Sequence, residues 1–67
     1  MSLQETIGKN IRDHRIELGL IQKELSKKTG LTIRTLGRVE RGEVDVKIST
    51  LFKISSALGV SVAELLT

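Results

Sequence analysis

The 67-residue sequence contains no cysteine and no cluster of histidine, aspartate or glutamate at metal-ligand spacing. A disulfide framework and a structural metal are therefore excluded, and no cofactor is expected. A chain of this length buries little apolar surface. Ordinary helix packing must hold it together, with modest stability or stability shared with a partner subunit.

Long apolar runs are also missing. No segment approaches the roughly 20 apolar residues that cross a bilayer, and the first residues lack the apolar run of a secretion signal. The absence of cysteine suits a reducing compartment. We therefore expect a cytoplasmic protein with no membrane association.

Proline, tyrosine and tryptophan are absent, phenylalanine occurs once, and apolar residues recur at helical rather than alternating spacing, which argues against a sheet. We predict an all-α, compact five-helix fold in a single domain over residues 1–67. Ser2 with Glu5 and Ser61 with Glu64 have the spacing of capping boxes at helix starts. The helices are expected at about residues 2–18, 22–29, 32–41, 48–58 and 61–66.

Apolar residues at helical spacing mark the sides of the first and fourth helices that should face the core. On the first helix they are Leu3, Ile7, Ile11 and Leu18. On the fourth they are Ile48, Leu51, Phe52, Ser55 and Leu58. The only histidine, His14, falls within the first stripe and has no nucleophile or carboxylate partner, so we expect a structural residue and no enzymatic activity.

The connection between the second and third helices is only Gly30-Leu31-Thr32. A loop this short forces the two helices to cross steeply, which predicts a helix-turn-helix over about residues 22–41. That window holds six basic and two acidic residues, whereas the rest of the chain has a net charge of −1. A positive surface confined to one stretch is expected of a protein that binds DNA phosphates, although a solvated charged face would show the same excess.

The third helix has two distinct sides. With about 100° per residue, Leu36, Val39, Ile33 and Glu40 share the side that should face the core. Guanidinium groups, which match the paired acceptors of guanine and also phosphate oxygens, occupy the opposite side. They belong to Arg34, Arg38 and Arg41. Because the major groove admits one α-helix, this arrangement favours DNA recognition.

Glu40 needs a partner, since a carboxylate on the core side is costly unless paired. On the first helix, Arg15 lies at the edge of the apolar stripe, where an unpaired arginine is also disfavoured. We therefore predict an Arg15–Glu40 ion pair that joins the first helix to the end of the third.

Three stretches resemble the lambdoid phage repressor and Cro family of helix-turn-helix domains: RIELGLIQKELSKKTG from Arg15, RVERG from Arg38 and ALGV from Ala57. The resemblance covers about residues 7–66 and rests on spacing across five helices. It implies a repressor-like regulator of transcription that binds double-stranded DNA in a sequence-specific way. Repression is the expected outcome for a small domain without an effector region.

The resemblance also implies roles for particular residues, including the Arg15–Glu40 pair. Bases would be read by Thr32, Ile33, Arg34 and Arg38. A phosphate contact is implied for Gln22, and Thr35 would lie near a phosphate or a thymine methyl. Arg41, from the arginine row of the third helix, and Lys47 are the further candidates for phosphate contacts.

Several positions depart from the family pattern. Ile21 stands where a polar residue usually contacts a phosphate, and Lys47 stands where a serine or threonine usually caps the fourth helix. Ile33 replaces a polar base reader, and would either pack on a thymine methyl or extend the core. Gly37 within the third helix would either allow close approach to DNA or be a tolerated substitution.

One short helix rarely supplies enough specificity, so we expect a homodimer on two-fold-related half-sites about 34 Å apart. The last helix carries more apolar side chains than it can turn inward, which makes it the candidate interface. These side chains are Val62, Leu65 and Leu66, with Ile16 on the first helix a weaker candidate. The alternative function is an antitoxin of a toxin–antitoxin pair, or another protein-binding helical module.

Overall fold

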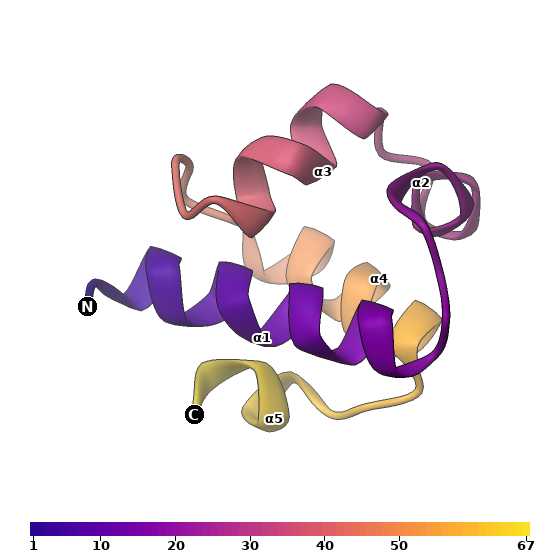
Figure 1. Cartoon of the computed structure of the whole chain (residues 1–67). Coiled ribbons are helices and arrows are strands. Elements are labelled where there is room, and N and C mark those ends of the chain that lie inside the picture. The colour runs from indigo at the N-terminus through magenta and orange to yellow at the C-terminus, as the bar shows by residue number, and fades with distance from the viewer.

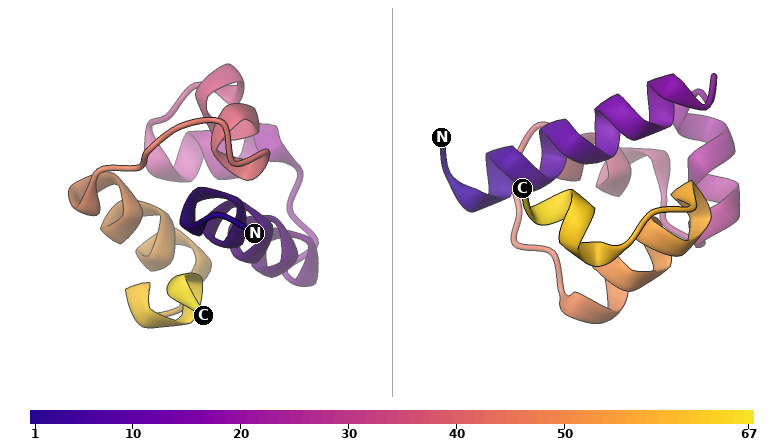
Figure 2. Two further views of the ribbon diagram at one scale, coloured as in Figure 1. Left: turned by 90° about the vertical axis from the view of Figure 1, so that its left-hand side faces the viewer. Right: turned by 90° about the horizontal axis from the view of Figure 1, so that it is seen from below.

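The computed structural model describes residues 1–67 and contains five helices, in the predicted order and within two residues of the predicted bounds. They are α1 (Leu3–Glu17), α2 (Gln22–Thr29), α3 (Ile33–Glu40), α4 (Ile48–Leu58) and α5 (Val62–Leu66). Helix α1 runs through the middle of the molecule, with α3 on one side and α5 on the other (Figures 1 and 2). None of the helices has the length and apolar character needed to cross a membrane.

Both predicted capping boxes are present. The Ser2 hydroxyl accepts a hydrogen bond from the Glu5 backbone N–H, and the Glu5 carboxylate accepts one from the Ser2 N–H, at 3.1 and 2.9 Å. The bond from the Ser2 backbone is the main cause that lowers the pKa of the Glu5 carboxyl. Ser61 and Glu64 repeat the arrangement at the start of α5.

The core combines side chains from all five helices. Ile11 of α1, Leu25 of α2 and Leu36 of α3 are fully buried in one core, where α3 packs on α1 and α2 packs on α3 and α4. Burying each such side chain contributes roughly 1.5–3 kcal/mol. The complete set is Ile7, Ile11, Leu25, Leu36, Val39, Leu51, Ile54, Leu58 and Leu65.

The expected apolar stripes are wrong at several positions. Leu3 and Leu18 are more than half exposed, because the ends of α1 lie outside the region where other helices pack on it. On α4, Ile48 and Phe52 are 71% and 65% exposed, and Ile54 is buried in their place. The buried side of α4 is therefore rotated from the predicted one.

The prediction of Leu65 as a dimer contact is also wrong. Its side chain is fully buried in the core, because α5 packs against α1. The Asn10 side chain strengthens this contact by donating to the Leu65 carbonyl at 2.9 Å. Of the other two candidates, Val62 is half-buried against the core and Leu66 is 40% exposed.

Helices α1 and α3 approach each other closely at Gly8. A Cβ atom on Gly8 would lie 2.3 Å from the Val39 carbonyl oxygen and 2.7 Å from that of Glu40. Only glycine permits this backbone contact. The contact brings the end of α3 against α1, where Arg15 lies about two turns further along.

Candidate nucleic-acid interface

The turn between α2 and α3 is held by local hydrogen bonds. Gly30 ends α2 in the left-handed conformation, with φ of 76°, and its N–H donates to the Ser26 carbonyl at 2.9 Å. The buried Thr29 hydroxyl donates to the Leu25 carbonyl and accepts from the Leu31 N–H. These bonds fix the direction in which α3 leaves α2.

The first turn of α3 presents its side chains to solvent. Thr32 caps the helix, since its hydroxyl accepts from the Thr35 N–H at 3.1 Å. Arg34 is exposed, and Ile33 is 46% exposed. The expectation that Ile33 shares the core-facing side is therefore wrong, because the first residue of α3 lies beyond the packed part of the helix.

The arginine row of α3 is exposed, as predicted from the helical wheel. The Arg34 side chain makes no hydrogen bond or ion pair within the protein. Glu43, which sequence reasoning missed, accepts a hydrogen bond from Arg41 at 2.8 Å and lies 3.8 Å from Arg38. The bond from Arg41 lowers the pKa of Glu43, so this carboxylate stays charged and offsets part of the positive charge at the end of the row.

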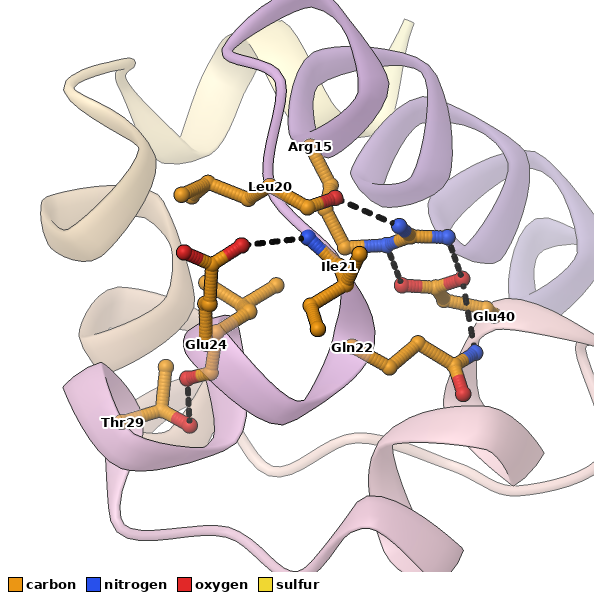
Figure 3. A network of polar contacts seen from close by, with 8 residues as sticks. Arg15, Leu20, Ile21, Gln22, Glu24, Thr29 and Glu40 are labelled. Atoms are coloured by element: carbon orange, nitrogen blue, oxygen red, sulfur yellow. Dashed lines mark hydrogen bonds and ion pairs between the residues drawn. The ribbon is translucent and has the colours of Figure 1, made fainter.

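The predicted Arg15–Glu40 pair is present and buried. Arg15 Nε and Nη2 donate to the two carboxylate oxygens of Glu40 at 2.7 and 3.0 Å, and Arg15 Nη1 donates to the Leu20 carbonyl at 2.7 Å (Figure 3). The two side chains are 11% and 4% exposed. This paired geometry satisfies both charges where an unpaired charge would be costly.

The start of α2 joins the same network. Gln22 Nε2 donates to Glu40 Oε1 at 3.1 Å, so the amide is held toward α3. At the cap position, where Ile21 is exposed and has no capping side chain, the Glu24 carboxylate accepts from the Ile21 N–H at 3.0 Å (Figure 3). The glutamine predicted to bind a phosphate is therefore held in place by the ion pair.

An open polar pocket of about 210 Å³ lies where α1, the start of α2 and the end of α3 meet. No hydrophobic residue lines it. Sequence reasoning missed one of its arginines, Arg12, because it lies outside the helix-turn-helix; its position one turn before Arg15 was the available signal. The lining residues are Arg12, Arg15, Gln22, Gly37, Glu40 and Arg41.

Lys47 lies apart from this cluster, at the start of α4. It is exposed and occupies the cap position without a side-chain capping bond, as its residue type predicts. The Lys47 ammonium group forms no hydrogen bond or ion pair within the protein.

A short helix, a tight turn and an exposed arginine-bearing helix packed on a common core define a helix-turn-helix domain. The helix-turn-helix family HTH_3 matches residues 11–65. The chain belongs to this family of transcriptional regulators, as the resemblance to phage repressors and Cro proteins implied.

Known proteins support the assignment. The chain is 39% identical over 67 residues to the control protein C.SmaI of Serratia marcescens, covering all of this chain and 80% of that protein. The restriction-modification controller protein C.AhdI of Aeromonas hydrophila has a similar structure, with a TM-score of 0.88, 32% identity, and coverage of 92% of this chain and 94% of that chain.

The structure of the hypothetical transcription factor NHTF from Neisseria gives a TM-score of 0.93 with 32% identity. It covers 98% of this chain and 76% of that chain. The similarity thus extends across all five helices, and it confirms the predicted fold class.

Proposed function

We propose that this DNA-binding regulator acts as a homodimer that places α3 of each subunit in the major groove of two-fold-related half-sites and represses transcription. The exposed arginine row of α3 carries the proposal, since Arg34 has no partner within the protein and is free to meet a base. The named regulators to which the chain is similar support a general function in DNA-binding regulation of transcription.

The individual contacts follow from exposure. Arg34 and Arg38 project from the outer side of α3, where guanidinium groups would favour guanine. The exposed part of Ile33 supports packing on a thymine methyl rather than in the core. Thr32 completes the proposed base-reading set, and the proposed phosphate contacts remain Gln22, Thr35, Arg41 and Lys47.

Selection of bound sequences from random duplex DNA tests this proposal. The wild-type chain is expected to select a two-fold-symmetric site with half-sites about 34 Å apart. Arg34→Ala and Arg38→Ala are each expected to relax selection at one guanine, at a cost of ~1–3 kcal/mol in discrimination.

The control variant is Lys53→Ala, because Lys53 is exposed on α4 and is not among the residues proposed to contact DNA. This variant should select the same DNA sequence as the wild-type chain. If Arg34→Ala weakens all sequences equally, Arg34 is a phosphate contact. Absence of DNA binding by the wild-type chain would contradict the proposal and favour a protein-binding module such as an antitoxin.

Because Leu65 is buried in the core, the proposed dimer interface moves from the apolar residues of α5 to exposed apolar residues of α4. Ile48 and Phe52 lie one turn apart, and Phe52, the only aromatic residue, is 65% exposed. Large exposed apolar side chains that lie together mark interaction surfaces. Leu66 at the end of α5 is the candidate retained from the sequence.

Phe52→Ser is expected to raise the dissociation constant of the dimer at least about tenfold, because aromatic side chains dominate interface energies. The fold should persist, since Phe52 contributes little to the core. Sedimentation equilibrium with and without a palindromic duplex measures the effect, and Leu18→Ser is the control at another exposed apolar residue. A wild-type chain that is monomeric in both conditions would contradict the dimer.

A further inference from the structure

The polar pocket between α1, α2 and α3 has a net positive charge. Its lining contains three arginines and one glutamate. Glu40 is neutralised by Arg15, and both of its carboxylate oxygens already accept hydrogen bonds. The charge that remains comes from Arg12 on α1 and from Arg41 after α3, although Glu43 offsets part of the Arg41 charge.

Donors are available in this pocket and free acceptors are few. The Arg12 side chain makes no hydrogen bond or ion pair with the rest of the chain. Gln22 uses its amide nitrogen to donate to Glu40, which leaves the second N–H of that amide unused. Arg41 donates to Glu43 through Nε and has its two terminal nitrogens left. This arrangement suits an anion with several acceptor oxygens.

Gly37 keeps the pocket open. A Cβ atom there would lie 3.2 Å from Arg41 Nη1 and 3.8 Å from both terminal atoms of the Gln22 side chain. A side chain at this position would occupy the space between the two donors. Glycine is disfavoured inside a helix, so the open pocket offers a reason for its presence in α3.

We propose that Arg12, Gln22 and Arg41 together bind one phosphate group of the DNA backbone in this pocket, and that Gly37 leaves room for it. The inference rests on the proposed function. DNA is the favoured source of the phosphate because Arg41 belongs both to the pocket and to the arginine row of α3, so the pocket adjoins the surface that reads the groove. The volume of about 210 Å³ holds several waters at about 30 Å³ each, and so one phosphate group.

Salt titration of DNA binding tests the role of Arg12. Arg12→Gln is expected to weaken binding to every duplex by about tenfold for each subunit bound, as loss of a hydrogen bond to a charged group would. The slope of log affinity against log salt should fall by about 1 for each lost phosphate contact, and so by about 2 for the proposed homodimer. Lys53→Gln removes the same charge away from the pocket and should leave the slope unchanged.

Gly37→Ala tests the pocket without removing a charge. The variant is expected to be at least as resistant to urea as the wild-type chain, because alanine is the better helix former, and yet to bind DNA several-fold more weakly. Weaker DNA binding with an unchanged fold supports the proposal, because the alanine methyl group would then occupy space that the phosphate needs. Wild-type affinity in Gly37→Ala, or an Arg12→Gln slope equal to that of Lys53→Gln, would overturn the proposal.

These outcomes separate the pocket from the overall function. If the wild-type chain binds DNA with sequence preference but Arg12→Gln behaves as the control does, the proposed function stands and the pocket assignment fails. Titration with inorganic phosphate at constant ionic strength, followed by the amide NMR signals of Gln22 and Gly37, tests a free anion. Weak, millimolar binding is expected; micromolar binding that leaves DNA affinity unaffected would assign the pocket to a free phosphorylated ligand instead.

Discussion

Glu40→Leu is expected to lower the free energy of unfolding by about 3–5 kcal/mol, because it leaves Arg15 buried without its counter-charge. The Arg15 side chain is only 11% exposed, and two of its three nitrogens donate to Glu40. The substitution also releases the amide of Gln22. Urea unfolding at a fixed protein concentration measures the effect.

A double-mutant cycle isolates the pair. Arg15→Met combined with Glu40→Leu removes both charges, so the double variant should be clearly more stable than the sum of the single losses predicts. Asp13→Asn is the matched control: it breaks the exposed Lys9–Asp13 pair on α1 and should leave stability nearly unchanged. Additive losses at Arg15 and Glu40 would contradict the inferred coupling.

Gly8→Ala is expected to destabilise the protein by about 3 kcal/mol or more, at or above the upper end of the range for overpacking. The new methyl group would meet the carbonyl oxygens of Val39 and Glu40 at 2.3 and 2.7 Å. Both are backbone atoms, so α1 and α3 must move apart to relieve the contact. This movement would also pull Arg15 away from Glu40.

This expected loss of stability is opposite to the usual effect of the substitution, since replacing glycine with alanine in an unstrained helix stabilises a protein by about 0.4–1 kcal/mol. Gly37→Ala provides the comparison, because its methyl group would first meet the flexible end of Arg41. Urea unfolding of the two variants should shift the midpoint down for Gly8→Ala and leave it unchanged or raised for Gly37→Ala. An unchanged midpoint for Gly8→Ala would show that the helices separate without cost.

Local signals in the sequence predicted the secondary structure well. The capping serines and the glycines after the helices depend on contacts within a few residues, which do not need the rest of the fold. The arginine row was also predictable, because helical periodicity places its members on one side of α3. The Arg15–Glu40 pair was predictable because charge on a core-facing side requires a partner within reach.

Packing between helices was less predictable. The exposure of Leu3 and Phe52 and the burial of Leu65 depend on where another helix covers each surface. A helical wheel gives the direction of a side chain but not the length over which a neighbour packs. The pocket residue Arg12 was missed for the same reason, since most of the other residues that line the pocket come from the start of α2 and the end of α3.

The sequence by itself therefore determined five helices, a helix-turn-helix and a positively charged face on α3, because turns, caps and helical periodicity act over short distances. Only the tertiary structure decided which apolar side chains form the core, how closely α1 and α3 approach at Gly8, and that Arg12, Gln22 and Arg41 line one pocket. Those features depend on the crossing of helices that are distant in sequence, and the close backbone contact at Gly8 positions the ion pair that orients Gln22.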